Sequence, residues 1–231
     1  MVLFFLPHAG GSAKSYISFK RFLPKNLTVV PMELSGRFSR MQEPLIDNIP
    51  DCVSELIETH KELLSGEYAL FGHSMGTILA TELVRQVKEK GLATPVHIFL
   101  SGKNPPDEEV HCFDNILEAS DEEIVDYFSN NSLSASTPVP DNAFKRMLDK
   151  ILCTDVRMAE LYKATPEDVK FDCDITVLYG ESDPLLRGLD MSTWSRFTNG
   201  NCEVHSFEGD HFYYTGCKEA VCNIIKEKIC K

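Results

Sequence analysis

The feature that most constrains the fold is a serine framed by two glycines between an apolar run and a helical run. Residues 68–71 form the apolar run, the pentapeptide Gly-His-Ser-Met-Gly occupies 72–76, and a helix-period stretch begins at Thr77. In a G-x-S-x-G turn the serine adopts strained backbone angles that raise its Oγ above the end of a sheet, and the glycines leave space for the turn. The pattern predicts a sharp strand-to-helix turn with Ser74 as a candidate nucleophile; the first turn of an ordinary helix is the alternative.

Apolar, β-rich runs alternate with helix-period stretches along the chain. The runs are 2–6, 27–32, 68–72, 96–101, 175–179 and 202–207. Helical periodicity marks residues 46–64 and 77–90, and Gly91 supplies a stop for the second stretch. Strands that alternate with helices predict a mostly parallel central sheet flanked by helices. Because 231 residues suit one substantial core, we expect a single domain over 1–231, and the serine turn indicates the α/β-hydrolase fold.

The alternation breaks between residues 105 and 171, where no strong strand run appears. One helix is expected to open at Asp121 with Ser120 as its N-cap, and a longer helical region covers 142–163. The stretch 130–141 is rich in Ser, Thr, Asn and Pro and is interpreted as an exposed loop. We therefore predict a helical lid inserted at 105–171; ordinary sheet-covering helices are the alternative.

Two further residues complete a candidate catalytic triad. A serine hydroxyl needs a base within hydrogen-bond reach and a carboxylate that orients this base. In the α/β-hydrolase fold the chain order is Ser, acid, His, with the acid and the base on loops after later strands. Asp183 follows the run 175–179, and His211 follows the run 202–207. We predict Ser74 as nucleophile, Asp183 as orienting acid and His211 as base.

Other titratable residues near these positions are weighed as rivals. Glu181 and Asp210 are interpreted as surface carboxylates or as supporting hydrogen-bond partners. His205 lies inside a predicted strand, and His73 is expected to pack beside the nucleophile. The histidines without motif context, interpreted as structural, are His60, His97 and His111.

Backbone N–H groups are predicted to stabilise the oxyanion of the transition state. Met75 follows the nucleophile at a helix N-terminus and offers one N–H group. The second is expected from the loop 7–12, whose adjacent glycines permit close backbone approach. Ala9 is the candidate donor there, with His8 and Gly10 as alternatives, and a plain turn is the competing interpretation. A phosphate-binding loop is disfavoured because G-x-x-x-x-G-K-[ST] is absent.

The bulk composition excludes several classes of protein. A formal net charge of −12 argues against nucleic acid or an anionic membrane as the main partner, since both reward a basic face. No apolar run approaches the roughly 20 residues of a membrane span, and the start lacks the basic region of a signal peptide. The eight cysteines form no C-x-x-C pair and have no histidine at zinc-ligand spacing. We expect free thiols, no metal site and a soluble cytoplasmic protein; a disulfide framework is the alternative.

Motifs spread along nearly the whole chain resemble, in order, those of a known family. They are Leu6-Pro7-His8-Ala9-Gly10-Gly11-Ser12, Gly36-Arg37 with Glu43-Pro44, Phe71-Gly72-His73-Ser74-Met75-Gly76, Ser101-Gly102-Lys103 with Pro105-Pro106, Asp155-Val156-Arg157 with Tyr162, Gly180-Glu181-Ser182-Asp183 and Gly209-Asp210-His211-Phe212. Together they look like the type II thioesterases, stand-alone partners of nonribosomal peptide and polyketide synthases that are close to the medium-chain fatty-acid synthase thioesterases. Two departures are Ser35 in a segment that usually reads Leu-Pro-Gly-Arg, and Lys103-Asn104 after Ser101-Gly102.

The resemblance implies a substrate and a partner. It implies hydrolysis of acyl or aminoacyl groups, often wrong or stalled loads, from the phosphopantetheine arm of acyl or peptidyl carrier proteins. No cofactor of the enzyme itself is implied, and the helical insertion resembles a lid that shapes the acyl pocket. By the same resemblance Ser74, His211 and Asp183 act as the triad, with Ala9 and Met75 as oxyanion donors.

Carrier proteins tend to be acidic, as is this chain, so docking is expected to need a local basic rim. The candidates are Lys14, Lys20, Arg21, Arg37 and Arg40, and solvated surface charge is the alternative for each. The competing functions are a small-molecule carboxylesterase or lipase of the same fold, and a hydrolase-fold protein that only binds a ligand. A monomer is the default expectation.

Overall fold

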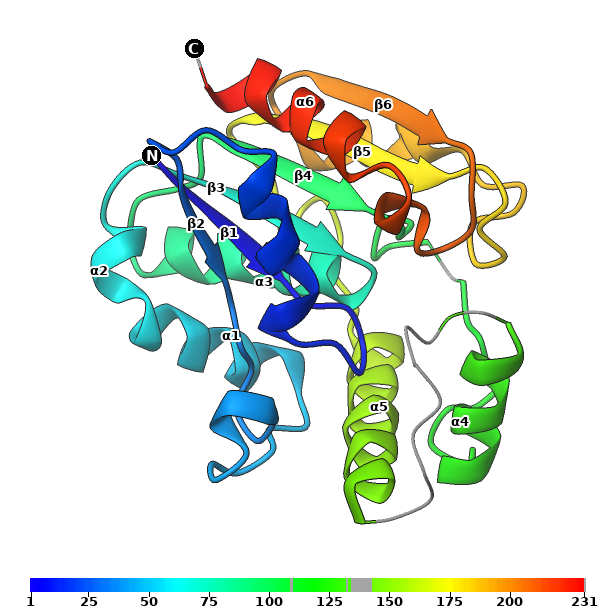
Figure 1. Cartoon of the computed structure of the whole chain (residues 1–231). Coiled ribbons are helices and arrows are strands. Elements are labelled where there is room, and N and C mark those ends of the chain that lie inside the picture. Colours follow the sequence, from blue (N-terminus) through cyan, green and yellow to red (C-terminus); the bar gives the residue numbers. More distant parts are fainter. Residues whose placement is uncertain (109, 132, 134–142, 231) are drawn as a thin grey trace.

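A six-stranded, fully parallel sheet forms the centre of the molecule, with strand order β2-β1-β3-β4-β5-β6 (Figure 1). The structure is a computed structural model that describes residues 1–108, 110–131, 133 and 143–230. Its strands are β1 (Val2–Leu6), β2 (Thr28–Pro31), β3 (Tyr68–His73), β4 (His97–Ser101), β5 (Asp174–Gly180) and β6 (Cys202–Phe207). Each predicted run corresponds to one strand within about two residues, so the predicted parallel sheet is confirmed.

Burial explains the composition of the strands. All six residues of β3 are buried, as expected for a central parallel strand with both faces covered. In contrast, β6 lies at the sheet edge and has no fully buried residue. His205 lies on this strand and is half-buried, as predicted.

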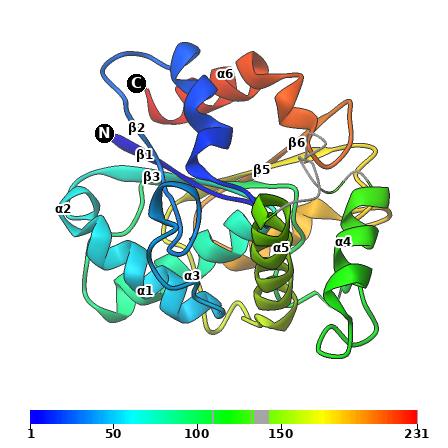
Figure 2. The same cartoon turned by 60° about the horizontal axis from the view of Figure 1, so that its bottom comes forward.

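Helices cover both faces of the sheet (Figure 2). One face carries α1 (Ile49–Thr59), α2 (Lys61–Leu64) and α3 (Met75–Glu89), whereas η1 (Ala13–Arg21) and α6 (Lys218–Ile229) lie together on the other. The side chains of β1 alternate between the two faces of the sheet and so contribute to both apolar cores. Phe4 and Leu6 pack in the core on the α1 and α3 side, and Leu3 and Phe5 pack in the core on the η1 and α6 side.

The predicted helix over 46–64 begins later and divides in two. Asn48 is the N-cap, because its side chain accepts a hydrogen bond from the Asp51 N–H at 2.9 Å, so helix α1 begins at Ile49. His60 ends α1 with non-helical backbone angles, and its ring Nδ1 lies 3.0 Å from the Leu56 carbonyl oxygen. The four-residue helix α2 follows.

The described part of the region 105–171 contains two helices that pack on each other. Helix α4 (Asp121–Asn130) begins with the predicted N-cap Ser120, which forms a reciprocal capping box with Glu123. Helix α5 (Ala143–Leu161) corresponds to the predicted region 142–163. A separate apolar cluster joins them, formed by Ile116, Ile124, Phe128, Leu133, Leu152, Cys153 and Val156. The predicted loop 130–141 lies almost entirely outside the described residues.

All eight cysteines lie within the described residues, and all are free thiols. Burial raises the pKa of the Cys52 and Cys222 thiols to about 12, so both are protonated and unreactive near neutral pH. Within the part of the chain that the structure describes, no helix combines the length and apolar character needed to cross a bilayer.

A buried histidine makes stability depend on pH. His97 Nε2 lies 2.8 Å from Thr176 Oγ1 inside the sheet, and burial lowers its pKa from 6.5 to about 4. Above pH 6.5 both the folded and the unfolded chain hold this ring neutral. Below that pH the unfolded chain binds the proton first, so stability is lost between pH 6.5 and 4.

We expect His97→Gln to reduce the loss of unfolding free energy over this window, by up to about 1.4 kcal/mol per pH unit, because one linked proton is removed. Urea unfolding at pH 7, 6 and 5 measures both slopes. Equal slopes for the wild type and the variant would contradict the assignment of this proton to His97.

Candidate active site

The predicted turn at Ser74 is present and strained. Strand β3 ends at His73 and helix α3 begins at Met75, with Ser74 between them at φ 55° and ψ −121°. A positive φ at a non-glycine residue costs on the order of 1–3 kcal/mol and persists only where its surroundings enforce it. Here the Ser74 N–H donates to the Ser101 carbonyl oxygen at 2.7 Å, and the Thr77 N–H donates to the Ser74 carbonyl oxygen at 2.9 Å.

The two glycines of the turn are required by close backbone contacts. A Cβ at position 72 would lie 2.1 Å from the Gly76 carbonyl oxygen. A Cβ at position 76 would lie 2.3 Å from the carbonyl oxygen of Leu6, the last residue of β1. The start of α3 therefore rests directly on the end of β1, and only glycine permits this approach.

Parallel pairing gathers the candidate residues at one edge of the sheet. Leu6 pairs with Gly72, His73 with Ser101, and Gly180 with Phe207, so the carboxyl ends of these strands are level. The loops that follow β1, β3, β5 and β6 consequently emerge side by side. In open α/β sheets, this edge is where ligands bind.

Asp183 and His211, predicted as acid and base, form a buried hydrogen bond. His211 Nδ1 lies 2.7 Å from Asp183 Oδ2, and the two side chains are 2% and 0% exposed. The Leu185 N–H donates to Asp183 Oδ1 at 3.0 Å and fixes the carboxylate. Because a carboxylate only accepts, the hydrogen-bond network assigns the His211 proton to Nδ1 and leaves Nε2 as an acceptor.

Ser74 lies close to the Asp183–His211 pair, because His73, the residue before it, contacts His211. The rings of His73 and His211 are 4.8 Å apart between centroids. Ser74 is half-buried, and among the described residues its Oγ has no hydrogen-bond partner. Catalytic hydrogen bonds commonly tighten only when substrate binds, so this geometry is compatible with a nucleophile and its base.

Two more histidines surround the predicted base and are uncharged. His73 Nδ1 lies 2.9 Å from Ser101 Oγ, which in turn lies 2.7 Å from the Tyr213 hydroxyl. Burial, reinforced by His211, holds the pKa of His73 well below its usual value and lowers the pKa of His8 to about 3. Both rings therefore stay neutral at physiological pH. His73 packs beside the serine, as predicted.

The rival carboxylates have other partners. Glu181 is exposed and accepts a hydrogen bond from Ser206 Oγ at 2.8 Å. Asp210 accepts from the Phe212 N–H at 2.9 Å, which supports the loop around His211. Within the described part of the chain, Asp183 is the carboxylate that pairs with His211.

The glycine-rich loop after β1 forms a turn beside Ser74. The Gly11 N–H donates to the His8 carbonyl oxygen at 2.9 Å, and Gly10 adopts φ 71°. The Gly10 N–H donates to Asp155 Oδ2 at 2.8 Å and is therefore occupied. Among the described residues, the N–H groups of Ala9 and Met75 have no acceptor.

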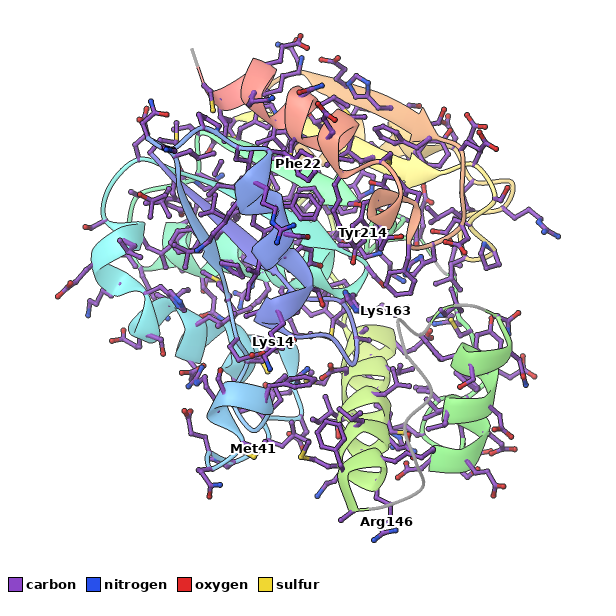
Figure 3. The ribbon with its side chains drawn as sticks, in the orientation of Figure 1. Lys14, Phe22, Met41, Arg146, Lys163 and Tyr214 are labelled. Carbon is purple, nitrogen blue, oxygen red and sulfur yellow. The ribbon has the colours of Figure 1, made fainter. Side chains whose placement is uncertain are left out.

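The predicted basic rim is wrong at Arg37. Its side chain is fully buried and forms a two-fold ion pair with Asp155, at 2.5 and 2.7 Å. Arg40 is engaged with Glu43 and Glu55. A charge in the sequence does not reveal its buried partner, although Arg37 and Asp155 both lie in motifs of the resemblance. Lys14, Lys20 and Arg21 are exposed on η1, where Figure 3 labels Lys14.

A comparison with protein-family models finds one family along nearly the whole chain. The thioesterase domain model matches residues 2–229. The chain belongs to this family. The thioesterase is 28% identical over 212 residues to the gramicidin S biosynthesis protein GrsT of Aneurinibacillus migulanus, covering 91% of this chain and 82% of that protein. It is 27% identical over 210 residues to the medium-chain S-acyl fatty acid synthase thioesterase of Homo sapiens, covering 90% of this chain and 78% of that protein.

Solved structures confirm the fold. The crystal structure of ClbQ from the colibactin NRPS/PKS pathway superimposes with a TM-score of 0.86 and 30% sequence identity, covering 99% of this chain and 96% of that chain. The predicted α/β-hydrolase fold is therefore confirmed. The structure of the type II thioesterase BorB from the borrelidin biosynthetic cluster superimposes with a TM-score of 0.85 and 30% sequence identity, covering 98% of this chain and 91% of that chain, which confirms the predicted membership of the type II thioesterases.

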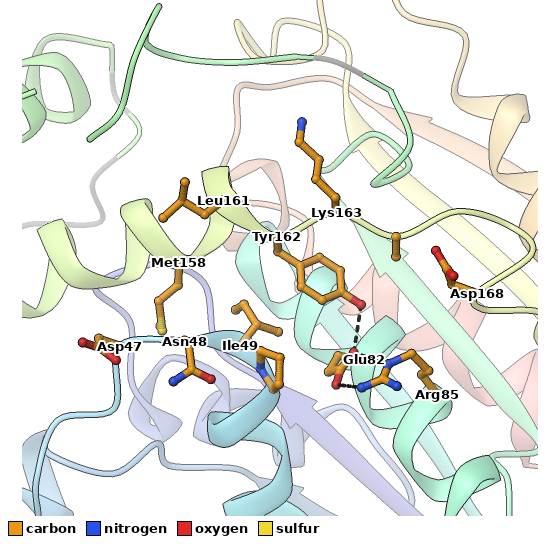
Figure 4. Close-up of a pocket in the computed structure, with 12 residues that line it drawn as sticks. Asp47, Asn48, Ile49, Glu82, Arg85, Met158, Leu161, Tyr162, Lys163 and Asp168 are labelled. Carbon is orange, nitrogen blue, oxygen red and sulfur yellow. Dashed lines mark hydrogen bonds and ion pairs between the residues drawn. The ribbon is translucent and has the colours of Figure 1, made fainter. Parts of the chain in front are cut away.

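A cavity of about 470 Å³ lies away from the candidate triad, between α1, α3 and the end of α5 (Figure 4). Ser74, Asp183 and His211 are absent from its lining. Its buried carboxylate, Glu82, accepts hydrogen bonds from Arg85 and Tyr162 at 2.6–3.0 Å, as Figure 4 shows. The Glu82 carboxylate therefore has hydrogen-bond partners from this chain, and these contacts connect α3 to the end of α5.

We expect Gly76→Ala to destabilise the thioesterase by roughly 3 kcal/mol and to abolish activity, because its Cβ would force α3 away from β1. Thermal denaturation and ester hydrolysis measure the two effects. Gly66→Ala is the matched control, since a Cβ there meets nothing within 4 Å. A Gly76→Ala variant as stable and active as the control would show that the close contact is unimportant.

Proposed function

We propose that this thioesterase hydrolyses acyl or aminoacyl thioesters on the phosphopantetheine arm of carrier proteins and so removes aberrant loads from nonribosomal peptide or polyketide synthases. The chemistry rests on one observation, the buried 2.7 Å hydrogen bond between Asp183 and His211 beside the strained Ser74 turn. The carrier rests on similarity to GrsT, named for gramicidin S biosynthesis, and to ClbQ, of an NRPS/PKS pathway.

In this proposal Ser74 is the nucleophile. His211 Nε2 takes the proton of the Ser74 hydroxyl as Oγ attacks the thioester carbonyl carbon, and Asp183 stabilises the imidazolium that forms. The neutral state of His8 and His73 supports this assignment, because neither ring places a second positive charge beside the imidazolium of His211.

The N–H groups of Met75 and Ala9 stabilise the oxyanion. Each such donor contributes on the order of 3 kcal/mol in a site where it is fixed before the reaction. Met75 opens α3, so the positive end of the helix dipole adds to its effect. The absence of a described acceptor for either N–H supports these two donors, and the use of Gly10 by Asp155 disfavours that alternative.

Collapse of the tetrahedral intermediate breaks the C–S bond. His211 returns its proton to the leaving thiolate, whose conjugate thiol has a pKa near about 8.5 and leaves readily. Water then attacks the Ser74 ester with His211 again as base, which releases the free acid and restores the enzyme. No metal and no bound cofactor takes part.

Helices α4 and α5 are proposed to form a lid, inserted at 105–171 in a single domain that spans 1–231. The separate apolar cluster between them supports this assignment, since these side chains pack away from the sheet. Leu152 of this cluster lies against the loop after β1, where a Cβ on Gly10 would lie 3.2 Å from its Cδ1. An acyl chain bound to Ser74 would therefore extend toward apolar side chains.

The decisive test is hydrolysis of a short acyl group from a phosphopantetheinylated carrier protein, followed by intact mass spectrometry. We expect the wild type to release the group and Ser74→Ala to slow release at least about 10⁴-fold. Nitrophenyl esters are assayed in parallel. If the carrier stayed loaded while these esters were cleaved, the enzyme would be a small-molecule esterase; if neither reacted, the triad would be wrong.

Asp183→Asn should lower kcat by roughly 10³ to 10⁴-fold with little change in KM, because the amide cannot hold the His211 proton on Nδ1. Steady-state kinetics measure both constants. Glu181→Gln is the matched control: it changes a carboxylate in the same loop whose one hydrogen-bond partner among the described residues is Ser206. Equal effects of the two substitutions would contradict the role of Asp183.

A further inference from the structure

The buried ion pair between Arg37 and Asp155 has no part in the mechanism above. Both side chains are 0% exposed, and they are joined by two hydrogen bonds at 2.5 and 2.7 Å. Replacing such a pair by apolar residues is often neutral or stabilising, so a buried pair is weak evidence for a role in stability alone. Its contacts indicate another role.

Asp155 also binds the loop that carries the proposed oxyanion donor. Its Oδ2 accepts from Arg37 Nη1 and from the backbone N–H of Gly10, the latter at 2.8 Å. One turn earlier on α5, Leu152 packs against the same glycine. Helix α5 therefore holds the loop by one polar and one apolar contact.

These contacts fix the two peptide planes on either side of Ala9. The His8 carbonyl and the Ala9 N–H belong to one planar trans unit and point in opposite directions. The hydrogen bond from the Gly11 N–H directs the His8 carbonyl toward the inside of the turn. The Ala9 N–H of the same peptide unit therefore faces outward. The bond from Gly10 to Asp155 fixes the next plane.

The second plane has two accessible orientations. A turn closed by residues 8 and 11 with φ 71° at Gly10 has the character of type II, whereas type I requires a negative φ at that residue. The two types differ by rotation of the central peptide, and glycine adopts both. Asp155 accepts the Gly10 N–H in the observed orientation and so favours it.

We propose that Asp155, neutralised and held by Arg37, is a positioning residue that fixes the turn 8–11 and thereby preorganises the Ala9 N–H for the oxyanion. The inference rests on the proposed function, since it takes Ser74 as nucleophile and Ala9 as donor. Arg37 is essential to it because an unpaired carboxylate beside the oxyanion would repel the developing negative charge.

The test variant is the double substitution Arg37→Met with Asp155→Leu, which removes both charges together and avoids leaving one buried and unpaired. We expect it to unfold cooperatively near the wild-type midpoint. Its kcat should fall 10–100-fold while KM changes less than about three-fold, because preorganised donors act in the transition state. Amide hydrogen exchange at Gly10 should become faster.

An alkylboronic acid supplies a readout that a purely structural role would not move. It forms a tetrahedral adduct on Ser74 that mimics the oxyanion, so its affinity should fall by the same factor as kcat. Glu82→Gln is the matched control, since it alters a buried carboxylate on α3 without contact to the turn, and it should leave kcat and boronate affinity unchanged.

Wild-type kcat and boronate affinity in the double variant would overturn the proposal, as would an increase in KM alone. The boronate binds Ser74, and this binding does not depend on which acyl group or leaving group the enzyme prefers. A wild type that binds boronate but does not release acyl groups from a carrier would therefore refute the carrier assignment and leave the positioning role to be decided by the double variant's affinity.

Discussion

Contact between the backbones of β1 and α3 determines how the serine turn and the loop after β1 lie relative to each other. The Leu6 carbonyl is so close to Gly76 that no side chain fits between them. This contact brings the loop after β1 beside the first turn of α3, and it is secured by the hydrogen bond from Ser74 to Ser101 on β4. The strain at Ser74 is thus maintained by three neighbouring strand ends.

The site combines one buried ionic hydrogen bond with neutral surroundings. Asp183 bonds to His211, whereas burial keeps the adjacent His8 and His73 uncharged. The nearby Arg37–Asp155 pair has no net charge. In a buried site of low dielectric constant, this arrangement leaves few opposing charges near the proposed N–H donors of Ala9 and Met75. Oriented N–H groups stabilise an anion most strongly under this condition.

The features of this fold that depend on local pattern and chain order are predictable from the sequence. The strands, the turn at Ser74 and the position of Asp183 and His211 after β5 and β6 follow from periodicity and from glycine spacing. Helix α1 begins at Ile49, later than the periodicity from residue 46 predicts, because Asn48 caps it. The 3-10 helix η1 is not predicted from the sequence, since nine residues are too few for apolar periodicity to identify a helix. The burial of Arg37 is not predictable from local pattern, because its partner Asp155 lies 118 residues away.

The separation of apolar clusters has a consequence for how this enzyme diversifies. Helix α4 packs on α5 through its own cluster, apart from the two that enclose the sheet. Mutations on α4 can therefore accumulate without repacking the scaffold. Helix α5 lacks this freedom because Asp155 ties it to Gly10. Natural variation among such enzymes should accordingly concentrate on α4 and spare the face of α5 that contacts Gly10.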